Sequence, residues 1–295
     1  FSFIEMEKLF KKYGLAKAAI DKHIDFILSS GFYITSKDKR AETIINDFIQ
    51  KEGFDQLLRA WIQEALIKGN GFMEIAMNKK EIKLQVVNAN NIYVDRTKTG
   101  KIVGYNQYVG EFNRFDIKKI IPFFPQEIAH LKIDTVGDDA YGMGLLVSAM
   151  KTLDNLGRAE EDMHILINRK ANAPIHAKLG SVEQPVTASD VIDFGSRLEY
   201  LNNLHEWATD HRVEFKVIDF GNLAEKFATV LEHDKEVLFY IFQIPPTIMG
   251  LSNIPEGLSD VQLDAFERRI KSLQANIEKI IEEQIFIPIL RMNGL

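Results

Sequence analysis

The sequence predicts an α+β fold in which amphipathic helices accompany a small, mostly antiparallel β region. Apolar residues recur at helical spacing over residues 15–30, 40–51 and 55–68. From Phe72 the period changes to two, and short alternating segments separated by turn residues continue to Lys132. Helical spacing then returns in longer segments, so strands and helices are largely segregated along the chain.

The N-terminal part is expected to be mainly helical. Gly31 follows the first helical pattern and supplies a stop signal, and the third pattern closes at Gly69-Asn-Gly71. Between the first two patterns, Phe32-Tyr-Ile-Thr35 is rich in β-forming residues. We therefore expect a short strand there.

Six strands are expected in the β region, at 72–77, 82–87, 92–94, 104–109, 120–124 and 127–132. Asn78-Lys-Lys80 and Thr97-Lys-Thr-Gly100 have the composition of hairpin turns. Antiparallel pairing of neighbouring strands follows from these short connections. A loop at 137–144, rich in Gly and Asp, then leads into a long helix.

Two long helices are predicted at 145–170 and 222–243, and each would extend roughly 30 to 40 Å. Between them the pattern predicts a small module of strand, helix and strand, at 175–179, 188–203 and 213–218.

The second long helix ends in a motif that contains paired prolines, Pro245 and Pro246. Proline lacks the amide donor and its ring clashes with the preceding turn, so we expect the pair to stop the helix. An exposed loop rich in Gly, Pro, Ser and Asn follows to Gly257. Its polar residues are too few for catalysis, which favours a mechanical or contact loop.

A further helix is expected from residue 258, with Ser259 as a possible cap. Its apolar residues alternate spacings of three and four, the rhythm of helices that pack along their length. One helix cannot bury such a stripe alone, and the pattern fits assembly and ordinary packing equally. The stripe consists of Leu263, Phe266, Ile270, Leu273, Ile277 and Ile280.

Composition excludes several classes of protein. The 295 residues contain no cysteine, so disulfides and thiolate metal sites are impossible. No apolar run approaches the roughly 20 residues that span a bilayer, and the N-terminus lacks the apolar core of a signal peptide. Because 42 acidic residues exceed 36 basic ones, giving a net charge of -6, tight nucleic-acid binding is disfavoured. Passage of DNA over scattered cations remains compatible with this charge.

Candidate catalytic groups are weak. Glu160, Glu161, Asp162 and His164 occupy nearly consecutive helical positions, point in different directions, and indicate a solvated face. A zinc site at His205-Glu206 and His211 lacks the HExxH spacing. The acidic segment 134–139 lacks the order of a calcium loop, and no P-loop, dinucleotide fingerprint or serine elbow occurs. We therefore predict no catalytic residue, no metal and no cofactor.

Four segments, taken in order, resemble the portal proteins of tailed bacteriophages, particularly the HK97-like family. Leu57 to Ile75 is similar to the helix, Gly-Asn turn and strand of that family. The segments at 126–132 and 141–146 resemble the entry into its first stem helix, and Phe242 to Gly250 resembles its helix end before the tunnel loop. The likeness covers nearly the whole chain.

This resemblance implies a portal fold with a division of the chain into named parts. The implied parts are a wing (1–144), a first stem helix (145–172), a clip (173–218), a second stem helix (219–246), a tunnel loop (247–257) and a wing or crown-directed helix (258–295). Family members commonly extend further at both ends, which leaves open a short crown or a trimmed chain.

The resemblance also implies a function without catalysis. The family forms a ring, usually of twelve copies, at one capsid vertex of the virion, assembled in the host cytoplasm. Double-stranded DNA passes through its channel during packaging and ejection. The implied partners are other copies of the chain, the terminase large subunit, a head-tail adaptor, and the major capsid and scaffolding proteins; no membrane is involved.

The implied site residues lie in the loop and the stems. The tunnel-loop candidates are Thr247, Ser252, Asn253, Ile254, Pro255 and Glu256, and the candidate channel cations are Lys151, Arg158, Lys226 and Lys235. Residues 247 to 257 carry no basic residue, so steric and hydrogen-bond contact is expected of the loop. Two alternatives stay open: a virion ring or adaptor that never conducts DNA, and a hydrolase using Glu161, His164 or His205.

Overall fold

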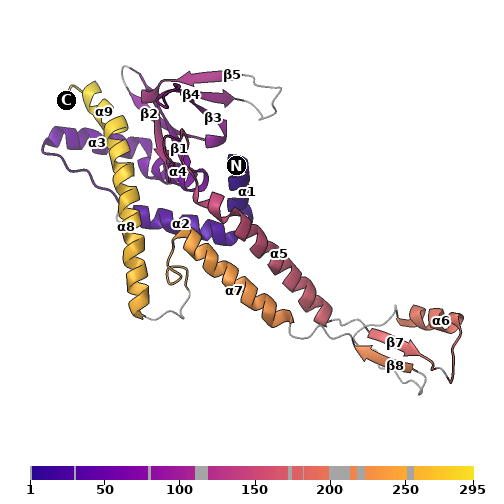
Figure 1. Cartoon of the computed structure of the whole chain (residues 1–295). Coiled ribbons are helices and arrows are strands. Elements are labelled where there is room, and N and C mark those ends of the chain that lie inside the picture. Colours follow the sequence, from indigo (N-terminus) through magenta and orange to yellow (C-terminus); the bar gives the residue numbers. More distant parts are fainter. Residues whose placement is uncertain are drawn as a thin grey trace. The chain divides into compact units, whose positions relative to one another are not determined.

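The computed structural model (Figure 1) divides into two compact units. Unit 1 comprises Phe1–Gly157 and His233–Leu295, and unit 2 comprises Arg158–Glu232. The structure describes residues 2–29, 31–78, 81–109, 119–171, 175–181, 183–198, 213–217, 223–250 and 256–295.

The described helices match the predicted ones closely. They are α1 (Phe3–Lys12), α2 (Gly14–Leu28), α3 (Lys39–Glu52), α4 (Phe54–Lys68), α5 (Leu145–Ala171), α6 (Ala188–Leu198), α7 (Leu223–Phe242), α8 (Glu256–Ile281) and α9 (Ile287–Met292). Short segments η1 (Ala89–Asn91) and η2 (Pro125–Glu127) are 3₁₀ turns, and η3 (Glu282–Phe286) is π-helical. None of the described helices is long and apolar enough to cross a membrane.

The strands also lie where the period of two predicts them. They are β1 (Asn70–Met77), β2 (Ile82–Val87), β3 (Ile92–Arg96), β4 (Ile102–Val109), β5 (Lys119–Phe123), β6 (Ile128–Lys132), β7 (Ile175–Leu179) and β8 (Val213–Val217).

The N-terminal helices differ from the prediction in two respects. Helix α1 was not predicted as an element, although Ser2 and Glu5 form a capping box that starts it. The strand predicted at Phe32–Thr35 is wrong, because these residues join none of the described ladders. Phe32 instead packs edge-on against Phe54, with ring centroids 5.7 Å apart, so its apolar character reflects contact with a helix.

The β region forms two three-stranded antiparallel sheets where one small β unit was expected. The orders are β2-β1-β6 and β3-β4-β5. Strand β6 returns to pair with β1, in the register Gly71↔Leu131, and this pairing separates the hairpins into two sheets. Phe72 of β1 joins Tyr105 of β4 in a shared core, which also contains Val87, Ala89, Ile92, Val94, Ile128 and Ala140.

Helix α8 packs against its own chain through part of the predicted stripe. Phe266, Ile270 and Ile277 are buried, whereas Leu263, Leu273 and Ile280 are only half-buried. Phe266 makes edge contacts with His23 and Phe26 of α2, and the Gln274 amide donates to the Ile27 carbonyl over 2.8 Å. The stripe therefore serves, at least in part, as ordinary packing within unit 1.

Unit 2 contains the predicted small module. Strands β7 and β8 pair antiparallel, with Ala177 opposite Phe215. Helix α6 lies between them in sequence, and its Phe194 ring contacts Phe215 with centroids 6.1 Å apart. The described helix ends at Leu198, and the rest of the predicted 188–203 span lies outside the described residues.

Glycines allow two backbones to cross closely in unit 1. Gly142 and Gly144, which precede α5, lie against Gly69 and Ile67 at the end of α4. A Cβ atom at Gly144 would overlap the backbone carbonyl of Ile67, and one at Gly142 would overlap the Gly69 carbonyl. Only residues without side chains fit this crossing.

Two buried histidines make the folded state sensitive to acid. Burial lowers the pKa of His23 to about 4 and the pKa of His130 to about 3, both from 6.5. His23 Nδ1 lies 3.0 Å from the Ala19 carbonyl, while its Nε2 has no hydrogen-bond partner among the described residues. The unfolded chain therefore binds more protons than the folded chain between pH 6.5 and the lowered values.

We expect Gly144→Ala to lower the free energy of unfolding by at least about 2 kcal/mol, because backbone atoms must move to admit the new Cβ. Gly14→Ala is the matched control: a Cβ there meets nothing within 4 Å, and stability should stay equal or rise slightly. Urea denaturation measures both. Equal stabilities of the two variants would contradict the close crossing.

The pH dependence of stability supplies a second prediction. Each histidine is buried in its neutral form, and its contribution to the free energy of unfolding is complete above pH 6.5. This contribution is lost as the pH falls toward the lowered pKa. The free energy of unfolding should therefore decrease from pH 7 to pH 4.5. His23→Leu should reduce this slope by up to about 1.4 kcal/mol per pH unit. A wild-type slope in that variant, measured by urea denaturation across the pH range, would show that His23 does not titrate as a buried group.

Candidate functional site

The end of α7 and the turn after it form the segment that the sequence singles out. The Ile244 amide donates to the Phe239 carbonyl and the Gln243 amide donates to the Tyr240 carbonyl, both over 3.1 Å. These two bonds make a Schellman cap, with Gln243 in the left-handed region at φ 55. Phe239 and Ile244, the two positions that commonly make an apolar contact in this motif, are both buried.

The cap lies just ahead of the prolines that the sequence analysis expects to stop the helix. Helix α7 ends at Phe242, before the prolines, because Gln243 turns the backbone left-handed. The carbonyls of Pro245 and Pro246 then accept from the amides of Ile248 and Met249 in consecutive turns. The prolines therefore follow the cap directly, where their missing amides disfavour a return to helix.

The predicted loop is less exposed at its start than expected. Pro245 is buried, Thr247 to Met249 are half-buried, and Gly250 is exposed. Glu256 was predicted in the loop, but it is the first residue of α8, so the predicted cap position, Ser259, lies inside the helix. Ser252, Asn253, Ile254 and Pro255 lie outside the described residues.

The four candidate channel cations lie on the two stem-like helices. Lys151 of α5 and Lys235 of α7 belong to unit 1, whereas Arg158 of α5 and Lys226 of α7 belong to unit 2. All four side chains are exposed. They are accessible to an anionic ligand, and their role in a channel stays a prediction.

The alternative catalytic groups are not gathered into a site. Glu160, Glu161, Asp162 and His164 are exposed on α5, as expected for a solvated face. His205, Glu206 and His211 lie outside the described residues. Over the described ranges, no three His, Asp or Glu side chains come together as metal ligands would.

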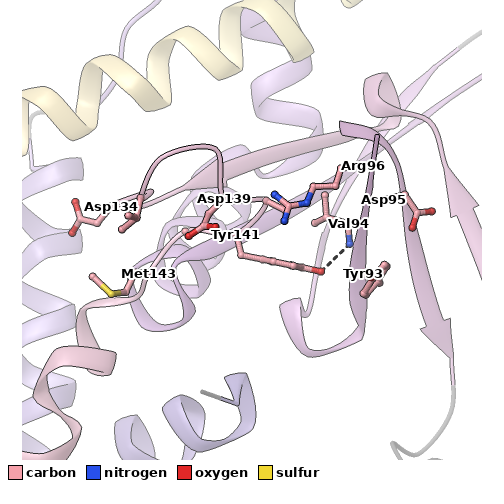
Figure 2. A pocket seen from close by; sticks show the side chains of 11 residues that line it. Tyr93, Val94, Asp95, Arg96, Asp134, Asp139, Tyr141 and Met143 are labelled. Atoms are coloured by element: carbon pink, nitrogen blue, oxygen red, sulfur yellow. Dashed lines mark hydrogen bonds between the residues drawn. The ribbon is translucent and has the colours of Figure 1, made fainter. Parts of the chain in front are cut away.

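A pocket of about 530 Å³ lies between β3 and the loop at 134–143 (Figure 2). Several of its polar groups are engaged within the chain: Arg96 Nη1 donates to the Asp138 carbonyl over 3.1 Å, and Asp134 pairs with Arg269 at 2.8 Å. The Tyr141 hydroxyl accepts from the Val94 amide over 2.8 Å, the bond drawn in Figure 2. These contacts fasten the loop, and they do not present a nucleophile beside a base.

The start of α5 is held by Asn70, a residue that sequence reasoning treated only as part of a turn. Asn70 is fully buried, and its Oδ1 accepts from the Gly142 amide over 2.8 Å. Its Nδ2 donates to the carbonyls of Lys68 and Gly142, each over 3.1 Å. Two segments that carry the portal resemblance, 57–75 and 141–146, are therefore in direct contact.

Comparison with a protein-family model supports this resemblance. Residues 12–121 match the model of phage portal proteins of the SPP1 Gp6-like type. The matched range contains α2, α3, α4 and the strands β1 to β4. A search of the curated proteins found no match.

Solved structures of gene transfer agent particles share the fold. A chain from the virion of the native particle is 16% identical, with a TM-score of 0.73, over 99% of this chain and 81% of that one. A chain from the neck of the native particle, computed with C12 symmetry, is 16% identical, with a TM-score of 0.70 over 95% and 79%. At these identities the likeness concerns the fold.

An HK97-family phage portal protein from Corynebacterium diphtheriae aligns less closely, at 12% identity with a TM-score of 0.46 over 78% of this chain and 72% of that one. The finer assignment to HK97-like portals stays a prediction. The family match over residues 12–121 and the fold shared over nearly the whole chain confirm the resemblance to phage portal proteins.

Proposed function

We propose that the chain is the subunit of a portal ring, set at one capsid vertex of a phage-like particle and conducting double-stranded DNA. The observation that carries this proposal is the phage portal match over residues 12–121. The fold shared with a neck chain of C12 symmetry supports a ring of twelve copies. The matched family is structural rather than enzymatic, and we propose no catalytic role.

The parts of the chain receive the following roles in this proposal. Residues 1–144 form the wing, 173–218 the clip, and 258–295 the part directed toward the crown. The stems, 145–172 and 219–246, correspond to the helices α5 and α7. Because α8 begins at Glu256, the proposed tunnel loop runs from Thr247 to Pro255.

DNA passage in this proposal depends on weak contacts. The net charge of -6 disfavours sticking, and exposed cations on α5 and α7 offer a few phosphate contacts. The loop has no Lys or Arg. We assign it a steric and hydrogen-bonding role around the DNA.

The partners of the ring follow from its place in a particle. We propose that the clip docks the terminase large subunit during packaging and a head-tail adaptor afterwards. The wing would contact the major capsid and scaffolding proteins during assembly in the host cytoplasm.

A second candidate is a neck ring that does not conduct DNA, which is favoured by the match to chains from particle necks. The two candidates differ in one measurable property: a portal is required for DNA to enter the capsid, whereas an adaptor acts after filling.

Deletion of Ser252 to Pro255 tests the channel role of the loop. This deletion spares α8, and Gly and Ser substitutions over the same four positions keep the chain length as a control. For the deletion variant we expect rings of normal size by negative-stain microscopy. We expect its DNA packaging, measured as nuclease-protected DNA, to fail or leak. Full packaging by the deletion variant would rule out the tunnel-loop role.

Replacement of stem cations tests DNA contact. The DNA affinity of assembled rings falls as salt rises, and the double variant Lys151→Gln with Lys235→Gln should make this fall less steep. The magnitude of the slope of log affinity against log salt should decrease by about 1 for each phosphate that the ring no longer neutralises. The control, Lys22→Gln with Lys37→Gln, removes the same charge from exposed positions outside the stems and should lower the slope less. Equal slopes in the two double variants would contradict a channel role for Lys151 and Lys235.

A further inference from the structure

Helix α5 is supported by packing along its first half only. The apolar face of that half is buried, and its residues are Leu145, Leu146, Ala149, Leu153 and Leu156. From residue 158 to residue 169, where the structure describes the side chains of the second half, none is buried, and Ile165 is 54% exposed. Because burial of an apolar face supplies most of the stability of a helix in a protein, the two halves differ in support.

Gly157 lies where this support ends. Unit 1 ends at Gly157 and unit 2 begins at Arg158, so the boundary between the compact units falls inside the 27 residues of α5. Glycine is a poor helix former, since it loses more backbone freedom than any other residue when a helix forms. A residue that weakens the helix therefore coincides with the point at which packing stops.

The ring of Tyr13 lies against this glycine. A Cβ atom at Gly157 would come within 2.8 Å of Tyr13 Cε1 and 3.1 Å of the Tyr13 hydroxyl. The same hydroxyl donates to Asp154 Oδ1 over 2.8 Å. Asp154 and Gly157 are one helical turn apart, so Tyr13 contacts one face of α5 at both positions. The ring fits there because residue 157 has no side chain.

Tyr13 itself is held in place by the backbone. It ends α1 and precedes α2, its amide donates to the Leu9 carbonyl over 3.0 Å, and its carbonyl accepts from the Lys17 amide over 3.1 Å. Lys12 Nζ lies 4.8 Å from the centroid of the Tyr13 ring, in the range of a cation-π contact. The side chain thus extends from a junction that is fixed to both helices.

We propose that Tyr13 clamps α5 at Asp154 and Gly157, and that α5 is jointed at Gly157, so that the helix beyond the clamp opens and bends independently of its first half. The clamp and the joint are properties of the single chain and do not depend on the proposed ring. Their consequence for a ring rests on the proposed function: the first stem would change direction at Gly157 while the backbone crossing ahead of Leu145 stays in place.

Hydrogen exchange of the unassembled full-length chain, measured by mass spectrometry, tests the joint. Amides in peptides covering residues 160–167 should exchange at least about tenfold faster, relative to their intrinsic rates, than those in peptides covering 147–156. Equal protection of the two halves would show that α5 opens as one unit and would overturn the joint.

Replacement of the tyrosine tests the clamp. Tyr13→Ala should raise exchange in peptides 147–156 at least about threefold more than in peptides from β1, because the loss is local to α5. Tyr13→Phe keeps the ring on Gly157 and removes only the bond to Asp154, so its effect should be smaller. An equal rise in α5 and β1, or no rise in either, would contradict a clamp at this position.

A size exchange at the contact gives an independent test. Gly157→Leu should raise exchange in peptides 147–156 as Tyr13→Ala does, because the new side chain displaces the ring. In the Tyr13→Ala background the same substitution should slow exchange there, since leucine favours the helix and the clash is gone. Asn155→Leu, at an exposed position of the same turn, is the matched control and should not raise exchange.

The result of the size exchange separates the clamp from a simple effect of helix propensity. If Gly157→Leu slows exchange equally with and without Tyr13, the ring does not hold α5 and the clamp is wrong. Because these measurements use unassembled chain, they stand whether or not the chain forms a ring, and failure of ring assembly would count against the proposed function alone.

Discussion

The structure of unit 1 depends on a close crossing of two backbones, one at Gly69 to Gly71 and the other at Gly142 to Gly144. The Ile133 amide donates to the Gly69 carbonyl over 2.9 Å, and the Met143 amide donates to the Ile133 carbonyl over 2.8 Å. The end of α4, the start of β1, the end of β6 and the start of α5 therefore meet within one hydrogen-bonded layer. The segment that leads into α5 is therefore held by main-chain hydrogen bonds as well as by the Asn70 side chain.

An ionic cluster around a buried lysine, beside this crossing, attaches α1 to the same layer. The Lys68 side chain is fully buried, and its Nζ lies 2.9 Å from Glu64, 2.9 Å from Asn88 and 3.3 Å from Glu7 of α1. The hydrogen bond from Lys11, together with Lys68, lowers the pKa of Glu7 to about 2. Glu7 thus stays charged through the pH range in which the buried histidines weaken the fold. Because a buried charge without partners is costly, Lys68 also constrains where α1 can lie.

The sequence predicted the helices and strands well where one periodicity ran between clear stop signals. Gly69, the hairpin turn at Thr97 to Gly100 and the loop before Leu145 all ended elements as expected. The predictions failed for segments whose structure depends on tertiary contacts. Phe32 packs on a helix although its neighbours have β propensity, and the pairing of β1 with β6 joins segments that no local pattern connects.

The π-helical segment η3 was not predicted, although the sequence contains a sign of it. Buried apolar residues at Ile277, Ile281, Ile285 and Ile289 are spaced by four, whereas the predicted stripe continued to Ile280 with spacings of three and four. A strict spacing of four drifts around an α-helix, and a wider π-helical turn restores the alignment. The π-helical η3 lies within this run, ahead of Pro288, whose missing amide would interrupt an α-helix there. The period of four was the sign that the sequence interpretation missed.

The site was predicted less completely than the fold, because its geometry depends on single residues in unusual conformations. Gln243 has no sequence feature that marks a left-handed cap, since glycine normally occupies that position. The consequence for the proposed channel is mechanical. Buried Ile244 and Pro245 anchor the point at which the segment leaves α7, so a loop that starts there begins from a defined position in every subunit.

The loop and the stems would also respond differently to salt. Thr247, Ser252 and Asn253 are neutral hydrogen-bonding residues, and their contact with phosphates would change little with salt, whereas contact by stem lysines would weaken as salt rises. In the proposed ring, a change in ionic strength would therefore alter DNA contact at the stems more than at the loops.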